Sequence, residues 1–243
     1  MRILVVNDDG INAEGLIRLA RAATKLGEVW VVAPDKQCSA ISQKITIGNY
    51  ILLKQEPEFP VAGVHAYSID GTPADCVKIA VEHIMDKKPD VLLSGINYGF
   101  NAGIEAAYSG TVAAAMEGLL KGIPGIAFSM EANGVYDVVD EYLDSLLREI
   151  TSLPVGIDEI WNVNFPGCTL DEYTGTLYDR PLAKSQYYTD KYVVVDRIQE
   201  NEVLKLEGEK ISRAELGSDL DALLNHYISI SNIKNSVICS SVY

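Results

Sequence analysis

Histidine and cysteine are scarce in this chain, and neither is grouped. The sequence has three histidines and four cysteines among 243 residues, with no CxxC pair and no HxxxH spacing. A zinc site of the usual nitrogen and sulfur ligands is therefore not expected. The cysteines, Cys38, Cys76, Cys168 and Cys239, are too scattered for a disulfide framework, and we expect reduced thiols.

Basic residues are in the minority, at 20 against 34 acidic ones, which gives a formal net charge of −14. This balance repels duplex nucleic acid and acidic membrane surfaces, so neither is an expected partner. A small anionic substrate stays compatible with it where a bound cation or a helix end reverses the field locally. The sequence also lacks an apolar run of membrane-spanning length and a signal-peptide layout at its N-terminus, so we expect a cytoplasmic protein.

Short apolar runs alternate with helical periodicity over the first two thirds of the chain. Residues 3–6 and 29–33 are continuous apolar runs on either side of a helical pattern over 16–26, which is typical of a βαβ unit. The alternation continues with predicted helices at 73–84, 111–120 and 135–150, and predicted strands at 91–93, 125–128 and 161–164. It predicts an α/β fold with a doubly wound, mostly parallel sheet over residues 1–167.

The texture changes after residue 167. Helical periodicity fades and tyrosines become frequent, which favours hairpins and extended arms. Residues 188–198 and 204–211 are predicted to pair as strands, and 219–225 to form a short helix. We therefore treat 168–243 as a C-terminal β-hairpin or arm region. It either wraps a partner subunit or closes one end of the sheet, and exposed tyrosines favour subunit exchange.

The acidic pair Asp8-Asp9 stands directly after the first predicted strand. Ligands of open parallel sheets bind at the carboxyl ends of the strands. Two adjacent carboxylates repel each other, and a hard divalent cation such as Mg²⁺ or Mn²⁺ would relieve that repulsion. The alternative is that one aspartate caps the following helix and the other is solvated. The pair alone does not decide between these interpretations.

Two further segments place polar groups at strand ends or helix starts. Asn97 follows the strand at 91–93 and offers a carbonyl oxygen to a hard cation, although a turn asparagine is an equally common interpretation. Residues 108–111, Tyr-Ser-Gly-Thr, precede an alanine-rich helix whose free N–H groups suit a phosphate, although Ser109 or Thr111 could be a plain N-cap. Together the three segments indicate a metal-assisted phosphoryl site. The sequence has no GxxxxGK[ST] loop, so a P-loop triphosphate site is not expected.

Several motifs occur in an order and spacing that resemble the SurE survival-protein nucleotidase family. They are NDDG at 7–10, VVAP at 31–34, a serine at 39 followed by IT at 45–46, GTPADCV at 71–77, SGINYGFNAG at 94–103, YSGTVAAAMEG at 108–118 and WNVNFPG at 161–167. The resemblance implies a Rossmann-like catalytic core over 1–167. It also implies one divalent metal cation per subunit, with Mg²⁺ or Mn²⁺ preferred, and phosphatase activity on nucleoside 5′- and 3′-monophosphates. A homodimer or homotetramer, assembled through the C-terminal arm, is expected as well.

The resemblance also assigns the site. Its metal ligands fall on Asp8, Asp9, Ser39 and Asn97, and Ser39 is a residue that the sequence alone does not single out. Its phosphate contacts fall around Asn101, Ser109, Gly110 and Thr111. Asp8 or Asp9 is then the expected general base, with direct attack by Asp8 on phosphorus as the alternative.

The chain departs from the family pattern at three places. Ala40 stands where glycine is usual after the serine, Ile104-Glu105 replaces an acidic pair, and residues 231–234 lack the usual Thr-Pro-Leu and its occasional histidine. Two other classes remain open: a phospho-accepting signalling module, and a nucleotide-binding regulatory protein without turnover.

Overall fold

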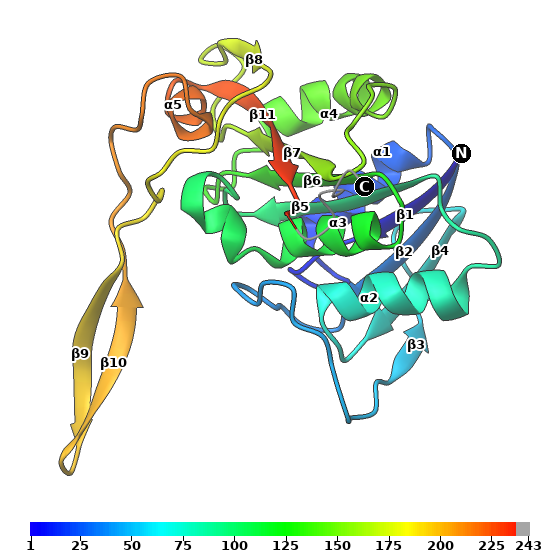
Figure 1. Cartoon of the computed structure of the whole chain (residues 1–243), viewed down its shortest axis with the longest axis horizontal. Coiled ribbons are helices and arrows are strands. Elements are labelled where there is room, and N and C mark those ends of the chain that lie inside the picture. Colours follow the sequence, from blue (N-terminus) through cyan, green and yellow to red (C-terminus); the bar gives the residue numbers. More distant parts are fainter. Residues whose placement is uncertain (237–243) are drawn as a thin grey trace, which may run out of the picture.

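One nine-stranded sheet carries most of the chain, which the computed structural model describes over residues 1–236 (Figure 1). Its strand order is β3 (Leu53–Gln55), β4 (Val64–Ile69), β2 (Glu28–Pro34), β1 (Arg2–Val6), β5 (Val91–Tyr98), β6 (Gly125–Met130), β7 (Glu159–Phe165), β11 (Tyr227–Lys234) and β8 (Gly175–Leu177). The strands from β4 to β7 in this order are all parallel, while β3 and β11 run antiparallel to β4 and β7. The predicted α/β class and mostly parallel sheet are confirmed.

The direction of winding reverses next to β1. The chain builds outward through β2 and β4 on one side of β1, and through β5, β6 and β7 on the other. Val6 at the end of β1 pairs with Ser94 of β5. The crevice beyond the carboxyl ends of these two strands is thus the topological switch point, where open α/β sheets bind ligands.

Helices cover both faces of the sheet. They are α1 (Glu14–Ala23) and α4 (Asp137–Ile150) on one face, and α2 (Pro73–Ile79), its π-helical continuation η1 (Ala80–Ile84), and α3 (Gly110–Leu120) on the other. Side chains of β1 alternate between these layers, with Ile3 and Val5 in the first cluster and Leu4 and Val6 in the second. Burial on both faces explains why the central strands are continuous apolar runs rather than alternating ones.

The third predicted strand is longer than expected. The prediction ended it at residue 93, with Asn97 beyond its end, but β5 continues to Tyr98. The pairing with β6 shifts register between Ser94 and Asn97. Gly95 lies in this irregular stretch at φ +134°, and a Cβ there would come within 2.2 Å of the Phe128 carbonyl oxygen. The small residue lets the strand continue through the motif, so Asn97 lies near the end of a strand.

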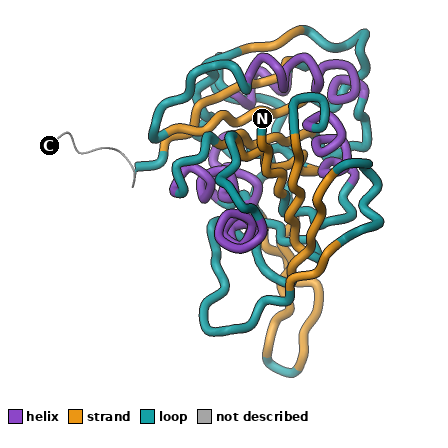
Figure 2. The backbone as a smooth tube through the Cα atoms, turned by 90° about the vertical axis from the view of Figure 1, so that its right-hand side faces the viewer, coloured by secondary structure: helices purple, strands orange, loops and turns teal. Residues whose placement is uncertain are grey.

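The C-terminal region contributes both to the sheet and to a projection. Strands β8 and β11 extend the core sheet, with α5 (Asp219–Leu224) before β11. Strands β9 (Lys191–Ile198) and β10 (Asn201–Glu207) form a separate antiparallel hairpin that leaves the body in both views (Figures 1 and 2). The predicted pairing is confirmed, although the second strand begins and ends earlier than expected. Residues 237–243 of this region lie outside the described part of the chain.

Two further expectations concern membrane-spanning helices and the state of the cysteines. No helix within residues 1–236 is long and apolar enough to cross a membrane. Cys38, Cys76 and Cys168 are free thiols, as expected. Cys239 lies outside the described residues.

The start of α2 anchors the long loop between β2 and β3. Asp75 accepts hydrogen bonds from the backbone N–H of Thr72 and from both the N–H and the hydroxyl of Thr46, the last at 2.7 Å. The Thr72 hydroxyl in turn donates to the Lys44 carbonyl at 2.6 Å. Burial raises the pKa of Asp75, but these hydrogen bonds outweigh it and hold the pKa below its ordinary value. The capping box of α2 thus fixes the loop that carries Ser39.

We expect Asp75→Ala to lower the free energy of unfolding at pH 7 by about 3 kcal/mol, because several donors lose a charged acceptor. A carboxyl with a lowered folded-state pKa stabilises above its unfolded pKa, and that contribution is lost as pH falls through the folded value. The deficit should therefore shrink at pH 3. Urea titrations at both pH values measure it, with the exposed Glu58→Ala as control. Equal stability of Asp75→Ala and wild type at pH 7 would contradict the anchor.

Candidate active site

A cavity of about 450 Å³ opens at the switch point, a size typical of small-molecule sites. Of the predicted site residues, Asp8, Ser39, Asn97, Asn101 and Ser109 line it. The other lining residues are Ala40, Tyr98, Glu105, Tyr108, Gln186, Asp190, Tyr192 and Leu206. They come from strand ends, the loop after β2, the start of α3 and the root of the β9–β10 hairpin. The fold thus brings together residues that are up to about two hundred positions apart in the sequence.

Asp8 is the most deeply placed acid of the cavity, with 4% of its surface exposed. Its Oδ1 accepts a hydrogen bond of 2.5 Å from the Thr111 hydroxyl at the start of α3. Burial raises its pKa to about 6, the Thr111 hydrogen bond lowers it in part, and the neighbouring Asp9 charge raises it further. The approach requires Gly110, because a Cβ there would meet the Asp8 carboxyl oxygen at 2.9 Å.

Asp9 does not line the cavity, and its carboxylate is held through both oxygens. It accepts the backbone N–H of Tyr98 at 2.8 Å and the Gln37 amide at 3.2 Å. Burial raises the pKa of Asp9, and these two hydrogen bonds counteract part of the effect. The alternative that one aspartate caps the next helix is wrong, because the N-cap of α1 is Ala13 and has no side-chain cap. Both carboxylates are therefore positioned for something other than helix capping.

Asn97 and Ser39 offer neutral oxygens to the same space. The Asn97 amide nitrogen donates to the Gly99 carbonyl at 2.8 Å, which leaves Oδ1 as the atom suited to a cation. Ser39 is exposed in the loop after β2, and the loop is tied down where the Cys38 N–H donates to the Asp8 carbonyl at 2.7 Å. Ala40 next to it has φ 52°, a region that glycine adopts at less cost. This explains why glycine is the usual residue there in the family pattern.

The start of α3 is shared between the helix itself and Asp8. Ser109 is the N-cap, and its hydroxyl oxygen accepts the N–H of Val112 at 3.0 Å. Thr111 is fully buried, and its hydroxyl is committed to Asp8. Neither Gly110 nor Thr111 lines the cavity with a side chain, so what they can offer a ligand is backbone N–H. The positive helix end thus stabilises the Asp8 carboxylate first.

Asn101 is fixed by a set of buried polar residues that sequence reasoning missed. Its N–H donates to Asn164 at 2.9 Å, and its carbonyl accepts the Asn162 amide at 2.8 Å. Its side-chain amide donates to Ser129 at 2.8 Å. We call Asn101, Ser129, Asn162 and Asn164 the asparagine cluster. The signal was present in β7, where two asparagines alternate with apolar residues on a strand predicted to be buried.

The cavity is acidic. Its lining includes the carboxylates of Asp8, Glu105 and Asp190, and none of its described lining residues is lysine, arginine or histidine. Burial also raises the pKa of Glu105. Within residues 1–236 no group of three or more histidine, cysteine, aspartate or glutamate side chains is placed to hold a metal. A set of two carboxylates with hydroxyl and amide oxygens, as on Asp8, Asp9, Ser39 and Asn97, fits a hard cation by its chemistry.

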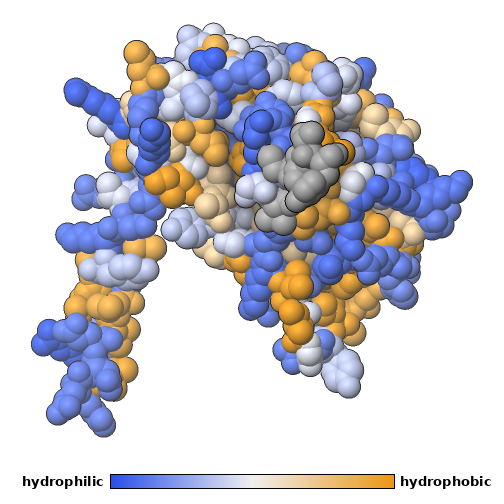
Figure 3. Space-filling model, in the orientation of Figure 1, coloured by the Kyte–Doolittle hydropathy of each residue, from blue (hydrophilic) through white to orange (hydrophobic). Residues whose placement is uncertain are grey.

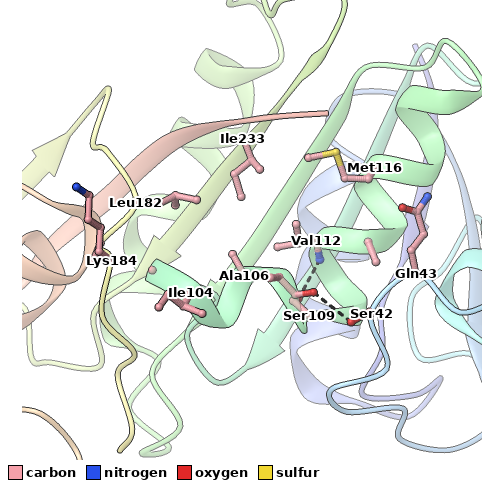
Figure 4. A pocket seen from close by; sticks show the side chains of 14 residues that line it. Ser42, Gln43, Ile104, Ala106, Ser109, Val112, Met116, Leu182, Lys184 and Ile233 are labelled. Atoms are coloured by element: carbon pink, nitrogen blue, oxygen red, sulfur yellow. Dashed lines mark hydrogen bonds between the residues drawn. The ribbon is translucent and has the colours of Figure 1, made fainter. Parts of the chain in front are cut away.

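A larger cavity of about 690 Å³ lies beyond Ser109, which lines both spaces (Figure 4). Its wall is mostly apolar, with Val112 and Met116 from α3, Ile104 and Ala106 from η2 (Gly103–Ala107), and Ile233 from β11. Asp8, Asp9 and Asn97 do not line it. The smaller cavity, which Asp8 and Asn97 line, is therefore the candidate site.

Comparisons with known proteins agree with this geometry. The crystal structure of SurE protein from Aquifex aeolicus superposes with a TM-score of 0.81 and 31% sequence identity, over 100% of this chain and 98% of that one. Residues 3–187 match the family described as Survival protein SurE. The chain belongs to the SurE family.

Curated relatives in the SurE family bear the name 5′-nucleotidase SurE. One from Gemmatimonas aurantiaca is 47% identical over 72% of this chain and 69% of its own length. Another, from Alkaliphilus metalliredigens, is 38% identical over 96% of this chain and 92% of its own length. A third, from Clostridium botulinum, is 35% identical over 95% and 92%.

We expect Thr111→Val to destabilise the protein in a pH-dependent manner. The variant removes the hydroxyl donor of a buried carboxylate, so the pKa of Asp8 should rise above about 6. At pH 8, where Asp8 is ionised, the free energy of unfolding should fall by about 2 kcal/mol. At pH 5, where Asp8 is largely protonated, the loss should be smaller.

Urea titrations with a metal chelator present measure the effect of Thr111→Val. Thr174→Val is the control, since this exposed threonine donates to the Asn225 carbonyl and not to an acid. A deficit that does not change between pH 5 and pH 8 would contradict the role assigned to Thr111.

Proposed function

We propose that this SurE-family chain is a metal-dependent 5′-nucleotidase that hydrolyses nucleoside 5′-monophosphates, and also 3′-monophosphates, to nucleoside and phosphate. The observation that carries the proposal is the acidic cavity at the switch point, which joins buried Asp8 to the polar groups of Asn97 and Ser109. The name of the curated relatives supports the substrate class. The cavity volume of about 450 Å³ suits a ligand of this size.

The proposal includes one divalent cation, Mg²⁺ or Mn²⁺. Three carboxylates and no basic side chain among the described lining residues would repel a phosphate, so a cation is needed for binding. Asp8, Asp9, Ser39 and Asn97 would hold it. Such an ion, when bound, supplies charge neutralisation at the phosphate and lowers the pKa of a coordinated water.

Asp8 is the preferred general base among the two aspartates. It lines the cavity, whereas Asp9 does not and already accepts a hydrogen bond on each oxygen. As an ionised carboxylate inside the cavity, Asp8 can accept a proton from a water next to it. Attack of that water on phosphorus breaks the ester P–O bond, and the nucleoside oxygen leaves and is protonated.

The phosphate contacts are proposed on Asn101, Ser109, Gly110 and Thr111. Asn101 and Ser109 line the cavity, and the asparagine cluster holds the backbone of Asn101. Gly110 and Thr111 would contribute N–H groups at the start of α3, where the helix dipole favours an anion. Their hydrogen bonds would orient phosphorus toward the attacking water.

Asp8→Asn and Asp9→Asn should each lower kcat for AMP by roughly 10²–10⁴-fold at saturating Mn²⁺, since each removes a carboxylate from the reaction centre. Colorimetric detection of released phosphate measures this. Asp35→Asn, an exposed acid in the loop after β2, removes the same charge outside the cavity and should keep wild-type activity. Tight AMP binding by wild type without phosphate release would favour a regulatory nucleotide-binding protein instead.

Removal of divalent cations should abolish AMP hydrolysis while the protein stays folded, as a thermal melt at the assay temperature would show. Addition of Mn²⁺ or Mg²⁺ should restore phosphate release, while Asp9→Asn should need more metal for half-maximal recovery. Full activity in excess EDTA would overturn the metal assignment.

We also propose that the chain is a cytoplasmic homodimer or homotetramer assembled through its C-terminal arm. The β9–β10 hairpin carries large apolar side chains that are at least one-third exposed: Tyr192, Val194, Val195, Ile198, Val203, Leu204 and Leu206. Such a surface on an isolated hairpin favours burial against another chain. The orange band along the projection makes this surface visible (Figure 3).

A double variant, Val195→Asp with Ile198→Asp, should dissociate the assembly because it places charges on this exposed apolar surface. Light scattering coupled to size exclusion should then give the subunit mass of 26.5 kDa instead of a multiple of it. A wild-type chain that runs as a monomer at micromolar concentration would contradict the proposal.

A further inference from the structure

The candidate cavity does not end at the strand ends but continues to the root of the hairpin. Tyr192 of β9 and Leu206 of β10 line it together with Asp8 and Ser109 of the core. These two residues are direct cross-strand partners, so their side chains lie on the same face of the hairpin. The cavity lining thus combines carboxylates and polar groups with an aromatic ring and a branched aliphatic side chain from the hairpin.

The two hairpin side chains of the lining present uncovered surface. Tyr192 is 69% exposed and Leu206 49% exposed, although both border the cavity. Polar groups lie beside them, since the Gln186 amide donates to Asp190 at 2.8 Å and both residues line the same space. A flat apolar platform with acceptor oxygens at its edge is the surface on which a nucleobase stacks and offers its N–H groups.

We propose that Tyr192 and Leu206 form the nucleobase subsite of this cavity. The proposal rests on the proposed function and deepens it, because it explains how a phosphatase would distinguish a nucleotide from a bare sugar phosphate. The phosphate would occupy the end near Asp8 and Ser109, and the base would lie against the Tyr192 ring. The substrate-binding site then includes the C-terminal hairpin as well as the core.

The next pair of residues along the hairpin provides control variants that distinguish binding of the base from a contact between subunits. Val194 and Leu204 form the following cross-strand pair on the same face, two residues further along each strand. They are 47% and 55% exposed but do not line the cavity. Loss of either should affect the apolar surface of the hairpin without removing the platform.

The test compares AMP with ribose 5-phosphate, which carries the same phosphate and sugar without a base. Tyr192→Ala should lower kcat/KM for AMP relative to that for ribose 5-phosphate by about tenfold, the size expected for one lost aromatic stack. Tyr192→Phe should retain most of the wild-type ratio, Leu206→Ala should show a smaller drop, and Val194→Ala should leave the ratio unchanged. Equal losses on both substrates, or the same ratio change in Val194→Ala, would overturn the subsite.

Equilibrium dialysis of adenosine distinguishes failure of the subsite from failure of the proposed function. Wild type should bind adenosine about tenfold more tightly than Tyr192→Ala, while Val194→Ala binds as wild type. If wild type releases no phosphate from AMP or ribose 5-phosphate, the proposed function fails, and Tyr192-dependent adenosine binding still supports the platform. Adenosine binding that is the same in wild type and Tyr192→Ala overturns the platform whatever the phosphatase result.

Discussion

The hydrogen bond between Asp8 and the Thr111 hydroxyl is the contact on which the site depends. It joins the end of β1 to the start of α3, and it requires that Gly110 carry no side chain. Because the carboxylate is buried, its charge is costly, and the donor and the helix end offset part of that cost. The remaining cost appears as a pKa of about 6. The fold thus keeps a buried carboxylate with a raised pKa at a place where it can bind a cation or accept a proton from water.

The asparagine cluster fixes a second part of the site, the segment around Asn101. Asn162 and Asn164 are buried side chains of β7, where apolar residues would pack at lower cost, yet both bond the backbone of Asn101. Hydrogen bonds from buried amide groups are directional, so they fix the position of the segment that they bond more sharply than apolar packing does. The segment after β5 is held in this way against the sheet, which fixes Asn101 at the cavity that Asp8 also lines.

The C-terminal region has two parts, one within the core sheet and one outside it. Strands β8 and β11 belong to the core sheet, whereas the hairpin stands apart from it. Asp219 links the two parts to the site, since it accepts the N–H groups of Gly103 and Ala183 at 2.8 Å. A cluster around Phe100, Tyr187 and Leu220 adds apolar contact at the same place. The hairpin root is therefore fixed next to the cavity even though its tip is free of the body.

The sequence by itself determined the α/β layering and most elements of the core, because strands buried on both faces and amphipathic helices have distinct periodicities. It also indicated the acidic pair and the helix start at Ser109, since each follows a readable strand or precedes a readable helix. The short strands β3 and β4, the continuation of β5 through Gly95, and the bond from Thr111 to Asp8 were decided only in the tertiary structure. So were the asparagine cluster and the place of Tyr192 at the cavity. These features rest on contacts between residues far apart in the chain, and no local pattern records which distant partner a side chain will meet.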